Sequence, residues 1–114
     1  MEFKTLRALL IAGAPVDVIT GCKRISIRTG HRDYVEGGHM LIGCHKTNWC
    51  VLATCTEVRY CKMSTITVQE VIDEGFDTLY ELFKHLQQYY PVLDWDTEMT
   101  VVRWSRPEGA LCDD

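Results

Sequence analysis

The stretch from Gly21 to Arg28 carries the residues best suited to chemistry. It reads Gly-Cys-Lys-Arg-Ile-Ser-Ile-Arg. In an extended chain Arg24, Ser26 and Arg28 point to one side, and the two isoleucines between them point to the other, where they can be buried. A guanidinium group offers several N–H donors in a fixed fork, so the polar side suits an anion or a planar polar ligand. The alternative is an antiparallel strand with one face in solvent.

Three residues of this stretch, Gly21, Lys23 and Arg28, form the pattern Gly-x-Lys-x-x-x-x-Arg. The pattern resembles the signature of the ASCH domain, a relative of the PUA RNA-binding fold. A polar loop, a turn at Gly37-Gly38 and an apolar strand follow it, in the order common in that family. The resemblance covers about residues 16–104. It implies an α+β fold, in which a small PUA-like, partly open β-barrel has two or three flanking helices and a cleft lined by the motif.

The resemblance implies a nucleotide- or RNA-binding domain that recognises a base, modified or unmodified, in this cleft. The ligand-binding residues are then expected to be Gly21, Arg24, Arg28, His31, Arg32 and Lys46. Basic side chains would contact phosphate, while Tyr34, Trp49 or Tyr60 would stack on a base. The alternative for these aromatic residues is packing in the core. The expected partners are a nucleoside, a nucleotide or single-stranded RNA.

The resemblance also allows a second function, that of a small amidohydrolase removing an acetyl group from the exocyclic nitrogen of acetylated cytidine. Lys23 and Ser26 match that group's base and nucleophile, with serine in place of threonine. Glu74 matches the acid, and Glu70 or Asp73 would serve if the alignment shifts. A hydroxyl needs a neighbouring base, and a lysine becomes one only when burial or a nearby cation lowers its pKa. A third alternative is a metal-independent ribonuclease, with the lysine and last arginine of the motif around the scissile phosphate.

The net charge of −4 conceals an uneven distribution. Residues 23–62 contain seven basic and three acidic side chains, whereas residues 63–114 contain three basic and eleven acidic ones. A positive middle segment predicts a local site for phosphate or a base, and the acidic C-terminal half predicts a surface for a protein partner. The alternative is that both sets of charges are solvated faces. An acidic protein does not fit a long nucleic-acid track, since such domains are usually basic overall.

Length and composition predict one domain spanning residues 1–114. Its hydrophobic fraction of 46% and charged fraction of 25% are ordinary for a soluble globular protein. Neither a bilayer-spanning run nor a signal-peptide pattern is found in the sequence, so we expect a cytoplasmic protein without a membrane partner. The six cysteines are therefore expected to be reduced. Cys44, Cys50, Cys55 and Cys61 lack Cys-x-x-Cys spacing, and Cys50 and Cys55 should point to opposite faces of one strand, so a four-coordinate zinc site is not expected. No cofactor is expected either.

Hydrophobic periodicity predicts the elements that position the motif. Strands are expected over Ile25–Arg28, Met40–Cys44, Trp49–Tyr60 and Met99–Trp104, with a hairpin turn at His45–Asn48. Helices are expected over Val16–Thr20, Thr65–Asp73 and Thr78–Tyr89. The last helix should begin with a capping box of Thr78 and Glu81 and end before Pro91. Leu6–Ile11 fits either a strand or a helix, and Ser105–Asp114 is expected to be a polar tail without regular structure.

Overall fold

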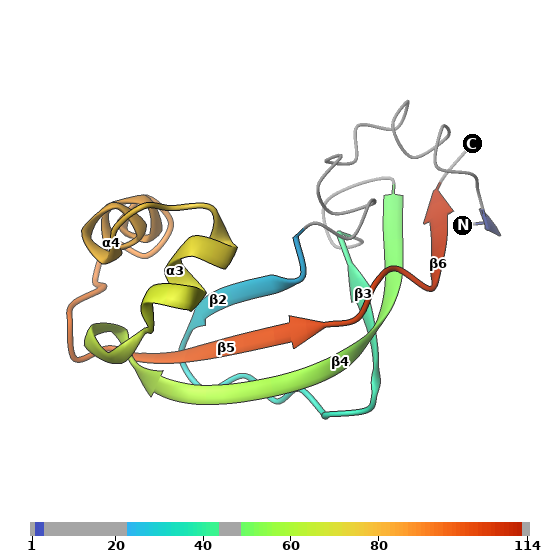
Figure 1. Ribbon diagram of the computed structural model, residues 1–114, viewed down its shortest axis with the longest axis horizontal. Coiled ribbons are helices and arrows are strands. Elements are labelled where there is room, and N and C mark those ends of the chain that lie inside the picture. The colour runs from blue at the N-terminus through green and yellow to red at the C-terminus, as the bar shows by residue number, and fades with distance from the viewer. Residues whose placement is uncertain (1, 4–22, 44–48, 113–114) are drawn as a thin grey trace. The chain divides into compact units, whose positions relative to one another are not determined.

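The structure, a computed structural model, describes residues 2–3, 23–43 and 49–112. The strands are β1 (Glu2–Phe3), β2 (Ile25–Thr29), β3 (His39–Ile42), β4 (Trp49–Lys62), β5 (Glu98–Trp104) and β6 (Gly109–Cys112). A 3-10 turn, η1 (Met63–Thr65), precedes the helices α3 (Val68–Glu74) and α4 (Leu79–Gln87) (Figure 1). The pairs β1–β6, β2–β5, β3–β4 and β4–β6 are antiparallel. The predicted α+β class is confirmed.

The chain divides into two compact units, and each is described by itself. Unit 1 contains residues 1–24, 35–56 and 104–114, and unit 2 contains residues 25–34 and 57–103. Strand β4 contributes residues to both units. Neighbouring hydrogen-bonded strands follow the order β1-β6-β4-β5-β2, and β3 also pairs with β4. The expectation of a single domain stays a prediction.

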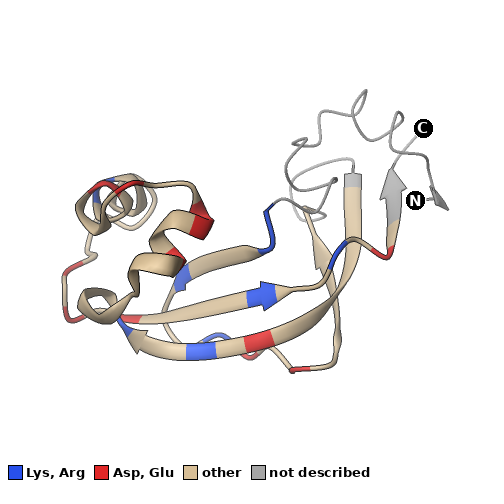
Figure 2. Cartoon of the chain, in the orientation of Figure 1, with Lys and Arg blue, Asp and Glu red and all other residues tan. Residues whose placement is uncertain are grey.

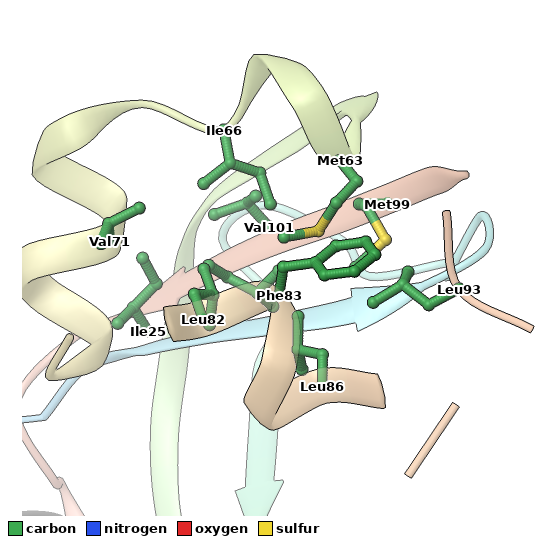
Figure 3. Close-up of a cluster of buried hydrophobic side chains, with 11 residues drawn as sticks. Ile25, Met63, Ile66, Val71, Leu82, Phe83, Leu86, Leu93, Met99 and Val101 are labelled. Carbon is green, nitrogen blue, oxygen red and sulfur yellow. The ribbon is translucent and has the colours of Figure 1, made fainter. Parts of the chain in front are cut away.

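Unit 2 is built around an apolar cluster between its strands and its helices. Strand β2 contributes Ile25 and Ile27, and β5 contributes Met99 and Val101. The helices add Val71, Leu82, Phe83 and Leu86, and the segments next to them add Met63, Ile66 and Leu93. These side chains point toward one another from the sheet and from both helices (Figure 3). Removal of this apolar surface from water is the main force holding α3 and α4 on the sheet.

Local signals in the sequence fix both ends of α3. The Thr67 hydroxyl accepts a hydrogen bond from the Glu70 amide at 3.2 Å, and the Glu70 carboxylate accepts one from the Thr67 amide at 2.8 Å. These two bonds form a complete capping box. Gly75 ends the helix with a φ of 102°, a left-handed conformation that favours glycine. The predicted helix over Thr65–Asp73 is therefore real, but its first residues belong to η1 and to the cap.

The predicted second helix is also confirmed, with slightly shorter bounds. The Thr78 hydroxyl accepts a hydrogen bond from the Glu81 amide at 3.1 Å. The Glu81 carboxylate accepts its own bond from Asp77 N–H at 3.3 Å, so the predicted capping box forms only on the Thr78 side. The buried stripe of α4 consists of Leu82, Phe83 and Leu86. Periodicity of apolar residues thus identified the packed face of this helix.

Unit 1 contains β3, β6 and the first part of β4. Met40 lies opposite Ala53 in the β3–β4 pair, and Ala53 is fully buried. The turn before β3 is held by two hydrogen bonds of 2.8 Å, from Gly37 N–H to the Cys55 carbonyl and from Cys55 N–H to the Gly38 carbonyl. Gly37 has a φ of 82°. The predicted glycine turn is confirmed, and it fixes where β3 begins to pair with β4.

Two predictions about described residues are wrong. Ser105–Asp114 is not an unstructured tail, because its residues Gly109–Cys112 form β6 and pair with β4. A four-residue strand is too short to show a hydrophobic period, and its partner lies far away in the sequence. Cys50 is disulfide-bonded, so the expectation of reduced cysteines fails there, while Cys55 and Cys61 are free thiols. That expectation rested on cell compartment, which says nothing about which cysteines are close in space.

The other predictions either concern residues outside the described part of the chain or are not tested by the structure. Leu6–Ile11, Val16–Thr20, Gly21, His45–Asn48 and Lys46 lie outside the described residues. The helices of the described residues are too short and polar to cross a membrane. Cytoplasmic location and a protein partner for the acidic half stay predictions.

Candidate nucleic-acid interface

Strand β2 separates its side chains between two faces, as its sequence predicts. Ile25 and Ile27 are 1% and 4% exposed and belong to the apolar cluster under the helices. Ser26 is half-buried and Arg28 is exposed on the other face. Arg28 lies opposite Thr100 of β5 in the register, so both side chains are on the face that turns away from the helices.

The loop that follows β2 is anchored to this second face by one buried hydroxyl. Thr100, which is fully buried, donates from Oγ1 to the Gly30 carbonyl at 2.6 Å and accepts from Arg32 N–H at 2.9 Å. Gly30 N–H also donates to the Glu98 carbonyl at 2.6 Å, and Gly30 has a φ of 81°. The loop therefore turns back over β5 beside Arg28, instead of extending away from the sheet.

An aromatic pair provides a second anchor for the same loop. The rings of His31 and Tyr60 stack with centroids 3.9 Å apart and planes inclined by 14°. The Tyr60 hydroxyl donates to the Arg32 carbonyl at 2.9 Å. His31 Nε2 lies 3.3 Å from an Asp33 carboxylate oxygen, and His31 Nδ1 lies 3.9 Å from one of Glu98. Tyr60 belongs to β4, so this loop is tied to two strands of unit 2.

We call the set of Ser26, Arg28, His31, Arg32, Tyr60 and Thr100 the motif face. Its two guanidinium groups are exposed. Arg32 Nε donates to the Thr29 carbonyl at 2.9 Å, which leaves its two terminal nitrogens directed elsewhere. Within the part of the chain that the structure describes, neither Arg28 nor Arg32 forms an ion pair with a carboxylate. Among the described residues, the motif face thus presents two cations without an ion-pair partner, next to an aromatic stack whose histidine contacts the carboxylates of Asp33 and Glu98.

Glu70, one of the residues of α3 considered as a catalytic acid, forms an ion pair and part of a helix cap. Glu70 is 4% exposed and receives two hydrogen bonds from Arg59, at 2.9 Å to Oε2 and 2.5 Å to Oε1. Burial opposes ionisation of Glu70, but the bonds from Arg59 and from the Thr67 amide outweigh it and lower the pKa of the carboxyl. Glu70 therefore stays ionised and serves the helix cap and the ion pair. A lowered pKa makes it a poor proton donor.

Asp73 is also held in an ion pair. It accepts hydrogen bonds from the side-chain amide Nε2 of Gln69 and from Arg103 Nη1, both at 2.8 Å. These bonds, Gln69 first, lower the pKa of Asp73 below its ordinary value. Glu74, the third carboxyl group considered for an acid, lies at the end of α3, and one of its carboxylate oxygens is shielded from solvent. In Figure 2 these acidic residues appear as red segments of α3, while β2, β4 and β5 carry blue segments.

The structure brings some of the predicted site residues together and separates others. Arg28, His31 and Arg32 share the motif face with Ser26. Glu74 lies on α3, which covers the opposite face of the sheet. Ser26 and the helix that carries Glu74 therefore lie on opposite faces of the sheet. Lys23 is half-buried and Arg24 is exposed, and both belong to unit 1, whereas Gly21 and Lys46 lie outside the described residues.

Sequence reasoning missed two residues that organise this region. Thr100 sits inside an apolar strand, where nothing local distinguishes an anchoring threonine from a packing one. Arg59 looks like one of several surface cations until Glu70 is placed next to it. A signal for Glu70 did exist, because Thr67-x-x-Glu70 before an apolar run has the spacing of a capping box.

The described residues contain no group of three or more histidine, cysteine or acidic side chains that could hold a metal ion. Cys61 lies on β4 and packs against the apolar cluster, and burial raises the pKa of its thiol. A protonated thiol is a poor nucleophile and a poor metal ligand. Cys61 therefore does not add a reactive group to the motif face.

Comparison with known proteins adds no further assignment. No protein-family model matches the chain, and no curated protein or solved structure matches it either. The geometry of the motif face is therefore the basis for assigning a function.

Proposed function

We propose that the motif face binds single-stranded RNA, with Arg28 and Arg32 holding the phosphate groups. The observation that carries the proposal is that both guanidinium groups are exposed without a carboxylate partner among the described residues, on an anchored strand and loop. Arginine recognises phosphate through two parallel N–H bonds, which a neighbouring carboxylate would otherwise occupy. Cations without an ion-pair partner attract phosphate even on an acidic protein.

Anchoring of the loop supports the same proposal. Arg32 is fixed at its amide by Thr100 and at its carbonyl by Tyr60, so its backbone position does not have to be ordered upon binding. Binding to a preorganised group loses less conformational entropy than binding to a mobile one. The resemblance of the motif to ASCH domains points in the same direction, and with it we propose a PUA-like barrel for the whole chain.

The test is a titration of a fluorescein-labelled oligouridylate of about ten nucleotides, followed by fluorescence anisotropy. Arg28→Ala and Arg32→Ala should each weaken binding about tenfold, which corresponds to about 1.4 kcal/mol. Each should also reduce the slope of log affinity against log salt by about one, because one phosphate contact is lost. The matched control is Lys84→Ala, since Lys84 is an exposed cation on α4, beside Tyr80 and away from the motif face.

Uridine monophosphate as competitor separates two sources of the same phosphate chemistry. Displacement of the oligonucleotide by the monophosphate at comparable concentration would identify a free nucleotide as the ligand. Displacement only by oligonucleotide would identify RNA. If Lys84→Ala weakens binding as much as the two motif-face variants do, the interaction is a general charge effect and the proposed site is wrong.

The hydrolase alternative is not part of this proposal. It needs the Ser26 hydroxyl and an acid on α3 to meet at one substrate, whereas α3 covers the face of the sheet opposite Ser26. Hydrogen bonds from Arg59 to Glu70, and from Gln69 and Arg103 to Asp73, lower the pKa of both carboxyls, which makes them poorer proton donors to a leaving amine. Binding without turnover is therefore the function that the geometry favours.

A further inference from the structure

One face of the His31 ring is available for a ligand. Tyr60 covers the other face, with the two rings 3.9 Å apart at their centroids. The ring edges are occupied as well, because Nε2 contacts Asp33 at 3.3 Å and Nδ1 lies 3.9 Å from Glu98. The His31 side chain nevertheless remains 53% exposed. A planar ring with one face and both nitrogens engaged exposes mainly its remaining face.

We propose that this outer face of His31 stacks on an unpaired base of the RNA, with Tyr60 as the support behind it. The inference rests on the proposed function, and it names the part of the nucleotide that His31 would recognise. Proteins that bind single strands combine cations for the backbone with aromatic rings on which bases stack. The motif face has both parts, since His31 of the stacked pair directly precedes Arg32 in the chain.

Tyr60 couples the base position to the phosphate position. Its ring supports His31 and its hydroxyl donates to the carbonyl of Arg32. One side chain of β4 thus fixes the platform for a base and the backbone of a phosphate-binding residue. Stacking does not read a hydrogen-bond pattern, so this platform selects single-stranded bases over paired ones without selecting a sequence. A base inside a duplex already has neighbours on both of its faces and cannot use the platform.

The experiment compares two oligomers of equal length, oligouridylate and an abasic sugar-phosphate chain, by competition against the same labelled probe. His31→Ala should weaken binding of the base-bearing oligomer about tenfold and leave binding of the abasic oligomer within about twofold. His31→Phe keeps a planar ring and should restore most of the lost affinity. His39→Ala is the matched control, because His39 is an exposed histidine on β3 in the other unit.

A spectroscopic readout tests stacking itself. An oligomer that carries one 2-aminopurine should lose fluorescence on binding to the unaltered protein, because stacking quenches this base. His31→Ala should abolish the quenching at saturating protein, and His31→Phe should retain it. Quenching that persists in His31→Ala would show that the base stacks elsewhere and would overturn the proposal.

Failure of this inference is distinguishable from failure of the proposed function. If His31→Ala weakens both oligomers equally, His31 orders the loop and does not stack on a base, although phosphate binding by Arg28 and Arg32 still holds. If the two arginine variants bind the abasic oligomer as tightly as the unaltered protein does, the phosphate site is wrong, whatever His31 does. Tyr60→Phe separates the two roles of Tyr60, since it keeps the ring and removes the bond to Arg32.

Discussion

The two faces of the unit 2 sheet use arginine in opposite ways. On the face covered by α3, Arg59 pairs with Glu70 and Arg103 pairs with Asp73. On the motif face, Arg28 and Arg32 have no carboxylate partner among the described residues. The four side chains look equivalent in the sequence, and only their partners distinguish them.

The difference shows which cations belong to the fold and which are available to a ligand. Arg59 and Arg103 attach α3 to β4 and β5, so each charge is paired with a carboxylate and at least one donor of each is engaged. Arg28 and Arg32 make no comparable contribution to holding two elements together. We therefore expect substitutions on the first face to change stability, and substitutions on the second face to change binding.

Arg59→Met should produce the largest loss of stability, and it tests most directly whether the arginines on the face covered by α3 stabilise the fold. The substitution leaves the Glu70 carboxylate, 4% exposed, without its main partner. Breaking a buried ion pair by removing one member typically costs about 3–5 kcal/mol. We expect a loss at the lower end of this range in the free energy of unfolding, measured by urea denaturation, because Glu70 keeps its bond to the Thr67 amide.

The double variant Arg59→Met with Glu70→Leu is the control for this prediction. Replacing both members of a buried pair by apolar residues is often nearly neutral. The double variant should therefore recover most of the lost stability, apart from about 1 kcal/mol for the missing half of the capping box. A loss as large as in the single variant would mean that the charge pair itself contributes the stability, contrary to our expectation.

The ion pairs on the face covered by α3 should make the stability of the protein sensitive to acid. The carboxyls of Glu70 and Asp73 both have pKa values below their ordinary ones in the folded protein. Their contribution to stability is therefore complete above the unfolded values, near pH 4 to 5, and is lost as the pH falls through the folded values. The free energy of unfolding, followed from about pH 6 to about pH 3, should fall less steeply in Glu70→Gln than in the unaltered protein.

Glu81→Gln serves as the control for the acid measurement. Glu81 is an exposed residue in the first turn of α4, and Arg59 and Arg103 both bond to residues of α3 instead. Its removal should leave the steepness of the acid profile nearly unchanged. Equal flattening in Glu70→Gln and Glu81→Gln would show that general charge repulsion, not the ion pairs of α3, sets the acid response.

Much of the fold followed from local patterns in the sequence. The alternation of isoleucine with Ser26 and Arg28 predicted the two faces of β2, and the spacing of apolar residues in α4 predicted its buried stripe. Strand β6 was missed because four residues carry no usable period and its pairing with β4 is a long-range contact. The Cys50 disulfide was missed for the same reason, since spatial proximity of cysteines is not a local property.

The site was predicted less completely than the fold. Arg28, His31 and Arg32 were identified from a motif and its following loop, and the structure places them on one face. The sequence could not show that Ser26 and Glu74 lie on opposite faces, because that depends on which side of the sheet α3 covers. Nor could it show that Thr100 anchors the loop, because a threonine in a strand is common and its hydroxyl partner is distant in the chain.

Thr100→Val tests whether the motif face depends on its anchor. Valine has nearly the same shape, but it cannot bond to the Gly30 carbonyl or to Arg32 N–H. We expect a loss of about 1–2 kcal/mol in unfolding free energy, because a part-buried carbonyl and a part-buried amide lose their partner. RNA affinity should fall too, since Arg32 is no longer held. Val102→Thr, on the same face, is the reverse control and should not change affinity.

Arg103→Met should have the smallest effect. It compares the partly exposed ion pair on the face covered by α3 with the buried pair on the same face. Arg103 and Asp73 have side chains that are 27% and 31% exposed, whereas Glu70 is almost fully buried. Asp73 also keeps its bond from Gln69, so the substitution does not strand a buried charge. Partly exposed ion pairs contribute about 0.5–1 kcal/mol, and we expect urea denaturation to show a loss in that range. A loss equal to that of Arg59→Met would mean that attachment of α3, and not burial of the partner charge, determines what each arginine contributes.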